Sequence, residues 1–168
     1  LSRYPTRASS ASIAQTSLKD KDPTIQLLAA RSVGASAQPV VLALVNDANR
    51  SDAIRAEAID WLIAHGQDEA VLSQTVRAAL PEASDGVRGR LFSLVAAHTL
   101  EVPSSELSPM AGDTDATLIA LCEALCATPY GGTEGALQGL IDPTRPEVTE
   151  RVARALADHG TAASVAHL

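Results

Sequence analysis

The sequence has 168 residues, of which 46% are hydrophobic, and its aromatic residues are limited to one Phe, one Trp and two Tyr. A chain of this length can bury one continuous core, and apolar content made mostly of Ala, Leu and Val favours closely packed helices over a sheet. The formal charge of −7 repels phosphates, so we expect neither nucleic acid nor a membrane as a partner.

Five segments open a helical pattern shortly after an acidic turn. Their apolar anchor residues are 29, 33, 31 and 30 positions apart, at Ile25, Ile54, Val87, Leu118 and Val148. A second helical pattern that ends in an acid precedes most anchors, as in SIAQTSLKD and PVVLALVND. Each unit is therefore predicted to be a helix, a short acidic turn and a second helix.

The predicted units repeat along nearly the whole chain. Helix pairs this short cannot bury their apolar faces alone, and stacked neighbours supply the missing cover. We therefore predict one all-α domain over residues 1–168, built as a right-handed α-α superhelix, or α-solenoid, of about five helix pairs. The units cover residues 10–34, 37–66, 68–98, 102–128 and 131–160, and residues 161–168 begin a further helix.

Two features qualify this pattern. In residues 99–113, Pro103 and Pro109 limit the first helix of the fourth unit to one or two turns, and Pro129, Gly131 and Gly132 break the chain after its second helix. At the start, LSRYP resembles the last turn of an earlier helix, and the initiating Met is missing. We therefore expect a segment of a longer protein, with residues 99–113 and 127–135 as its least regular parts.

The turn-and-helix segments NDANRSDAIRAEAI and PEASDGVRGRL resemble short HEAT-like repeats of bacterial helical-repeat proteins. In that family an Asp closes the first helix, and Val or Ile followed by Arg opens the second. Arg55 and Arg88 match this Arg, with Asp47 and Asp85 as their turn partners. The resemblance covers residues 10–160, implies the solenoid fold and says little about function. In the other three units the position of this Arg is occupied by Gln26, Ile119 and Thr149.

Each second helix is predicted to carry a buried stripe and a polar stripe. Counted from the anchor, offsets 4, 7 and 8 are mostly apolar, whereas offsets 3 and 6 collect polar side chains. Second helices usually line the concave side of a solenoid, so the polar stripe is the candidate partner-binding surface, with an apolar patch at its fourth unit. The alternative is an ordinary solvated face. The candidates are Glu57, Asp60, Arg90, Ser93, Leu121, Arg151 and Arg154.

The chain has only two cysteines, Cys122 and Cys126, at offsets 4 and 8 of the fourth unit. They are predicted to pack in the buried stripe, where a small polarizable side chain fits well. No CxxC pair is present, and we expect no metal site and no cofactor. Two cysteines on one helix are not a secreted disulfide framework, which favours a reduced, cytoplasmic location.

Offset 11, in the last turn of the second helix, is occupied by three histidines: His65, His98 and His159. We predict that they extend the buried stripe and interact favourably with the negative end of the helix. Gly66 and Gly160, which follow two of them, are predicted to adopt the left-handed cap. The alternative is a pH-sensitive or ligand-binding role.

Known catalytic motifs do not occur in the sequence. The GGTEGALQG segment lacks the Lys-Ser/Thr of a phosphate-binding loop, and neither HExxH nor GxSxG is present. We therefore expect no enzyme and no catalytic residue, and predict a protein-protein interaction or scaffolding module, with end-to-end self-association left open. The alternatives are a structural arm of a larger enzyme or redox protein, and a ligand-handling protein similar to the bilin lyases, whose repeats are also HEAT-like.

Overall fold

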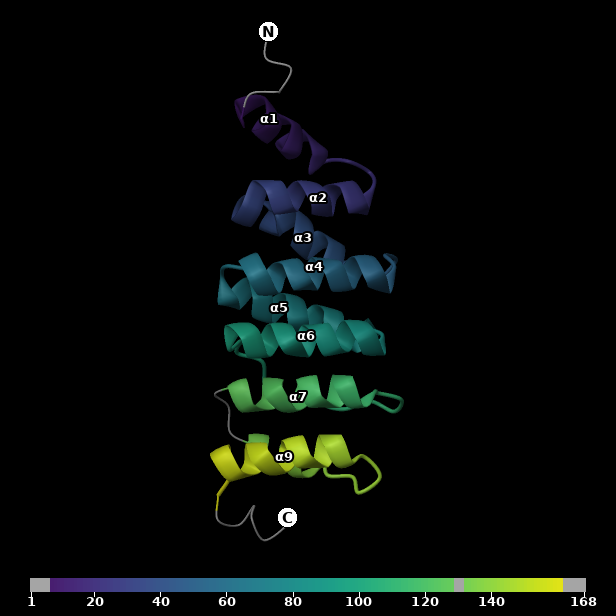
Figure 1. Cartoon of the computed structure of the whole chain (residues 1–168), viewed down its shortest axis with the longest axis vertical. Coiled ribbons are helices and arrows are strands. Elements are labelled where there is room, and N and C mark those ends of the chain that lie inside the picture. The colour runs from purple at the N-terminus through teal and green to yellow at the C-terminus, as the bar shows by residue number, and fades with distance from the viewer. Residues whose placement is uncertain (1–6, 129–131, 162–168) are drawn as a thin grey trace. The chain divides into compact units, whose positions relative to one another are not determined.

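The structure is a computed structural model that describes residues 7–128 and 132–161, without the side chains of residues 7–10 and His159 (Figure 1). Within these residues every regular element is helical and no strand occurs, which confirms the all-α class. The chain divides into two compact units, Leu1–Asp68 and Glu69–Leu168, and each is described by itself.

The first unit consists of short helices connected by tight turns. Asp22 starts one of them by accepting a 2.8 Å hydrogen bond from the Thr24 amide, and Pro23 occupies its first position. α2 and α4 contact each other, and α3 packs against both, with Leu27, Val41 and Leu62 at most 1% exposed between them. The elements are α1 (Arg7–Ser17), α2 (Pro23–Val33), the 3-10 helix η1 (Gly34–Ala37), α3 (Gln38–Asn46) and α4 (Asp52–His65).

One apolar run in this unit is long enough to cross a membrane. Pro23–Asn46 is a helical run of 24 residues that contains an 18-residue stretch with a mean hydropathy of 1.4. It is not one straight helix, because Gly34 has a φ of 73° and η1 separates α2 from α3, which contact each other. The two α-helices have 11 and 9 residues. Each is roughly 14 to 16 Å long, about half the hydrocarbon core of a bilayer. The run is weak evidence for a span, since buried core helices pass the same test of length and composition.

The second unit contains three long helices that lie side by side in a row (Figure 1). In the row α6 contacts α7 and α7 contacts α9, while α5 packs on α6 and α8 packs on α7 and α9. Gly89 permits the close approach of α6 and α7, because a Cβ atom there would lie 3.1 Å from the Thr117 hydroxyl. The elements are α5 (Glu69–Ala79), the 3-10 helix η2 (Leu80–Glu82), α6 (Asp85–His98), α7 (Asp115–Ala127), α8 (Thr133–Gln138) and α9 (Pro146–His159).

The buried stripe predicted for the second helices is confirmed at offsets 0, 4, 7 and 8 of α6 and α9. In α6 the stripe residues at these four offsets are 0% exposed, and the corresponding residues of α9 are at most 8% exposed. Ile25, the anchor of α2, departs from the pattern with 38% exposure. The stripe residues of α6 and α9 are Val87, Leu91, Leu94, Val95, Val148, Val152, Ala155 and Leu156.

A loop replaces the first helix of the fourth predicted unit. Residues 99–114, all of which the structure describes, contain no helix. They form a turn in which the amides of Glu106 and Leu107 donate to the carbonyls of Pro103 and Ser104 at 2.9 and 3.2 Å. The expected one or two helical turns are therefore replaced by hydrogen-bonded turns that do not continue into a helix, since proline removes a donor and the residue before it disfavours the helical region.

The loop nevertheless contributes to the core as a helix would. Leu100, Val102 and Leu107 are at most 1% exposed. On one side Arg77 of α5 donates two 2.7 Å hydrogen bonds to Glu106, which fixes the loop beside that helix. The chain break predicted after α7 comprises Pro129, Gly131 and Gly132. Pro129 and Gly131 lie outside the described residues, and Gly132 directly precedes α8 with a φ of 92°.

The predicted left-handed glycine caps are wrong. Gly66 has a φ of −58° and Gly160 a φ of −82°, so the chain leaves both helices without entering the left-handed region. Their amides still cap the helices, donating to the carbonyls of Leu62 and Leu156 at 2.7 and 2.8 Å. The left-handed cap occurs instead at Thr99, after α6, with a φ of 51°.

Candidate functional site

A cavity of about 410 Å³ opens between α7 and α9 and reaches the last turns of α6. We call it the α7/α9 groove. Its floor consists of small residues, and charged side chains of both signs stand around it. A second hollow of about 180 Å³ adjoins it and shares Arg151 and Arg154. The groove is lined by Ala96, Cys122, Glu123, Cys126, Ala127, Arg151, Arg154, Ala155 and Asp158.

α7 is the central helix of the row, and this position decides which of its residues reach the groove. Leu121 was predicted to form an exposed apolar patch with Ala124, but both are 0% exposed. The prediction is wrong because α6, α8 and α9 all contact α7 and enclose the face that is exposed in an end helix. α7 presents Glu123 and Cys126 to the groove instead.

The two arginines of the groove form ion pairs. Arg151 donates a 2.6 Å hydrogen bond to Glu123 of α7, and Arg154 a 2.5 Å hydrogen bond to Glu150 of α9. The side chains of Arg151 and Arg154 are 46% and 69% exposed. Exposed pairs of this kind contribute about 0 to 1 kcal/mol each, so a partner's charged groups can replace either member at small cost.

The other predicted contact residues lie outside this groove. On α6, Arg90 is exposed, and the half-buried Ser93 donates its hydroxyl to the Gly89 carbonyl at 3.0 Å. In the first unit, Glu57 accepts a 2.8 Å hydrogen bond from Arg31, and Asp60 is exposed. The structure therefore brings together only Arg151 and Arg154 of the predicted set.

The cysteines differ in exposure although both line the groove. Cys122 is 1% exposed, which confirms its predicted core position, whereas Cys126 is only half-buried. The pKa of the Cys122 thiol is raised, mainly by a hydrogen bond with Cys126 and to a smaller extent by burial. Cys126 is therefore corrected from a core residue to a residue of the groove wall.

The histidines do not extend the buried stripe as predicted. His65 is exposed; its ring stacks on Trp61 with centroids 4.9 Å apart, and its Nδ1 lies 3.2 Å from the Trp61 carbonyl oxygen. Offset 11 of α4 is therefore solvated, although Leu62 in the same turn is 0% exposed. His98 is half-buried, and the side chain of His159 lies outside the described residues.

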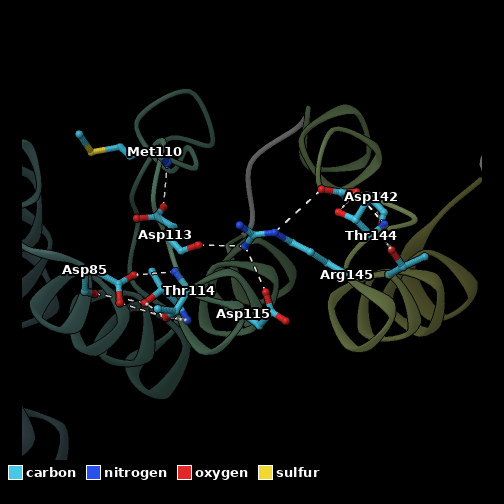
Figure 2. A network of polar contacts seen from close by, with 10 residues as sticks. Asp85, Met110, Asp113, Thr114, Asp115, Asp142, Thr144 and Arg145 are labelled. Carbon is cyan, nitrogen blue, oxygen red and sulfur yellow. Dashed lines mark hydrogen bonds and ion pairs between the residues drawn. The ribbon is translucent and has the colours of Figure 1, made fainter.

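A network of polar contacts links the N-terminal ends of α6, α7 and α9 (Figure 2). Asp85, the first residue of α6, accepts hydrogen bonds from the amide and hydroxyl of Thr114, the N-cap of α7, at 2.9 and 3.0 Å. Asp115, the first residue of α7, accepts a 3.1 Å bond from Arg145, the N-cap of α9, which also donates to the Asp113 carbonyl at 2.9 Å. The same contact thus recurs between successive helices and holds α7 and α9, the walls of the groove, in register.

Two aspartates of this network have lowered pKa values. Burial raises the pKa of Asp85, but hydrogen bonds from Thr114 and Thr117 outweigh it, and the net shift is below the usual 3.8. The hydroxyl and amide of Thr144 lower the pKa of Asp142. Hydrogen bonds therefore favour the charged form of both carboxyl groups.

The turn pairs that the family resemblance implied, Arg55 with Asp47 and Arg88 with Asp85, are not formed. Arg55 donates from Nε to the Val45 carbonyl at 3.0 Å, and Arg88 pairs with Asp113 at 3.2 Å. The reason is that other backbone amides occupy these carboxylates: Asp47 accepts from the amide of Asn49 in its own turn, and Asp85 accepts from the amide of Thr114 at the start of α7. The role of Arg145 was not foreseen; its place directly before the first residue of α9 is the signal that could have indicated it.

Within the residues that the structure describes, the fold places this protein in the all-α class. Comparison of the chain with models of known protein families, with curated proteins and with solved structures gave no match. Its function is accordingly inferred from the groove itself.

Proposed function

We propose that the chain is part of a HEAT-like α-solenoid that binds a protein partner through the α7/α9 groove. The solenoid is supported by the succession of helix pairs and by the recurring contact between the first residue of one long helix and the N-cap of the next. Repeats stacked in this way present extended surfaces made by equivalent helices, which is how such arrays usually bind other chains.

The observation that carries the binding proposal is the composition of the groove. Alanines and cysteines leave room above the floor for an apolar side chain of a partner. Around it stand Arg151, Arg154 and Asp158, all exposed, so a docking segment meets charges of both signs. A partner that inserts one apolar side chain and carries acidic and basic residues beside it fits this pattern, because complementary charges fix the register of a contact.

The test is charge reversal at Arg154, compared with the same change at Arg77. Both side chains are exposed, at 69% and 53%, and both take part in ion pairing, but Arg77 pairs with Glu106 and does not line the groove. Partners captured on the immobilised wild-type chain are identified by mass spectrometry, and their affinity for Arg154→Glu and Arg77→Glu is measured by calorimetry.

We expect the Arg154→Glu variant to lose at least about tenfold in affinity, since like charges now oppose each other, whereas the Arg77→Glu variant binds as the wild type does. Equal binding by both variants would place the docking surface elsewhere. A chain that captures only itself would replace the proposed partner by end-to-end self-association, which sedimentation at increasing concentration would show directly.

A further inference from the structure

The two thiols of α7 form a pair that partner docking does not explain. Cys122 and Cys126 are four residues apart, lie on one face of the helix and line the same groove. The pair is therefore reachable from solvent through Cys126, which is only half-buried, while Cys122 stands behind it.

The spacing of the pair is unsuited to a disulfide. Side chains at positions i and i+4 of a helix have Cβ atoms about 5 to 6 Å apart, whereas a disulfide requires about 3.5 to 4.5 Å. Closing that gap would unwind α7 where Leu121 and Leu125 are at most 1% exposed in the core. An ion between the two sulfurs needs less movement, because it holds them farther apart than the roughly 2.0 Å of a disulfide bond.

We propose that Cys122 and Cys126 together bind one soft monovalent cation, of the class of Cu(I), as two thiolate ligands. Thiolates are the ligands that select such ions, and Cu(I) accepts two of them in a nearly linear arrangement. Zinc needs four ligands, and the part of the chain that the structure describes groups no three His, Cys, Asp or Glu side chains that could hold a metal. Two thiols therefore match the softer, two-coordinate ion.

Charged side chains of both signs lie beside this complex. Binding displaces one proton from each thiol, so two thiolates and one monocation leave a net charge of −1. Arg151 and Arg154 line the same cavity, as do Glu123 and Asp158, so the lining adds no net charge and the thiolates themselves supply the attraction for the cation.

The experiment is a titration of the fully reduced chain with Cu(I) against a coloured chelator of Cu(I), under exclusion of oxygen. We expect one ion per chain, with an affinity that falls as the pH is lowered because protons compete for the thiolates. The Cys122→Ser and Cys126→Ser variants should each bind Cu(I) at least about a hundredfold more weakly than the wild type. Loss of a residue that only supports a metal ligand typically lowers the affinity by about 10- to 100-fold. Circular dichroism checks that both variants stay folded, and Cys126, on the groove wall, is the less disruptive site.

A matched control keeps two thiols but separates them. In the double variant Cys122→Ala with Ala120→Cys, the two cysteines are six residues apart and face different sides of α7. We expect this variant to bind as weakly as the single variants. If it binds Cu(I) as tightly as the wild type does, any two thiols suffice and the paired site is refuted; a ratio other than one ion per chain would refute it as well. The Arg154→Glu test leaves both cysteines in place, so the two proposals can fail separately.

Discussion

Arg55 and Arg88 occupy the same place in two different helices and have different partners. Each follows the anchor of its helix, and they are 3% and 5% exposed. Arg55 donates from Nε to the Val45 carbonyl at the end of α3. Arg88 meets both oxygens of Asp113 at 3.2 Å and donates to the Ser108 carbonyl at 2.8 Å.

The difference arises from the connection that faces each arginine. The short turn between α3 and α4 keeps Asp47 at its own surface, where it binds Arg50 at 2.9 Å. The long loop after α6 has no helix of its own and brings Asp113, 5% exposed, over Arg88. One buried guanidinium is thus satisfied by a neutral carbonyl and the other by a charge, and the energetic consequences differ.

The largest effect is expected from Asp113→Ala, which leaves the buried Arg88 without its counter-charge. Breaking a buried pair in this way should lower the free energy of unfolding by about 3 to 5 kcal/mol, measured by urea denaturation followed by circular dichroism. Amide exchange should rise in residues 99–114, because the Met110 amide also donates to Asp113 at 2.7 Å.

Two controls test this reading of Asp113. Asp115→Ala removes a carboxylate that is 46% exposed and should cost less than about 1 kcal/mol. The double variant Arg88→Met with Asp113→Leu removes both charges and should recover much of the loss, since apolar residues often replace a buried pair without penalty. Equal losses for Asp113→Ala and Asp115→Ala would contradict the importance of burial.

The next effect is expected in the first unit, from Arg55→Met. This change leaves the Val45 carbonyl without its Arg55 donor, at a cost of about 1 to 3 kcal/mol, below that of Asp113→Ala. Trp61, the only tryptophan of the chain, lies in α4 near Arg55, so its fluorescence reports the unfolding of this unit. A loss larger than that of Asp113→Ala would mean that a neutral partner matters more than a charged one.

The helix pairs themselves could be predicted from the sequence, because the spacing of apolar residues reflects burial of one helix face. Val87, Val148 and the acidic turns before them have the positions that the period implies. What the period cannot supply is the environment of a single helix. Leu121 is buried because α7 has neighbours on several sides, and the sequence of α7 contains no sign of the loop that replaces a helix beside it.

The site was predictable in part for the same reason. Arg151 and Arg154 lie on the predicted polar stripe and reach the groove, since α9 has the orientation that the stripe assumes. The pair of Arg154 with Glu150, four residues earlier on the same helix, is also indicated by spacing. Sequence position alone does not determine contacts between helices, such as the pair of Arg151 with Glu123 and the bond from Thr114 to Asp85.

A smaller, pH-dependent effect is expected from Asp85→Asn. The lowered pKa of Asp85 means that its contribution is present above the usual value of 3.8 and is lost as the pH falls through the lower pKa of the folded state. The Asn variant should lose roughly 1 kcal/mol near neutral pH and show a flatter decline of the free energy of unfolding below pH 4 than the wild type. If the free energy of unfolding fell equally steeply with pH in the two proteins, the hydrogen bonds from Thr114 would not favour the charged form of Asp85 over the protonated form.

The smallest effect is expected from Arg77→Ala. This change removes the exposed contact of loop 99–114, whereas Asp113 holds the same loop through a buried contact. The Arg77 and Glu106 side chains are 53% and 35% exposed, so their two hydrogen bonds should contribute less than about 1 kcal/mol. In roughly 1 M salt, where the Debye length is about 3 Å, the difference between Arg77→Ala and the wild type should disappear. The loss caused by Asp113→Ala should persist in the same salt, because ions do not screen a pair that solvent does not reach. If salt abolishes both losses, Arg88 and Asp113 behave as a surface pair, and the loop is held by its buried leucines alone.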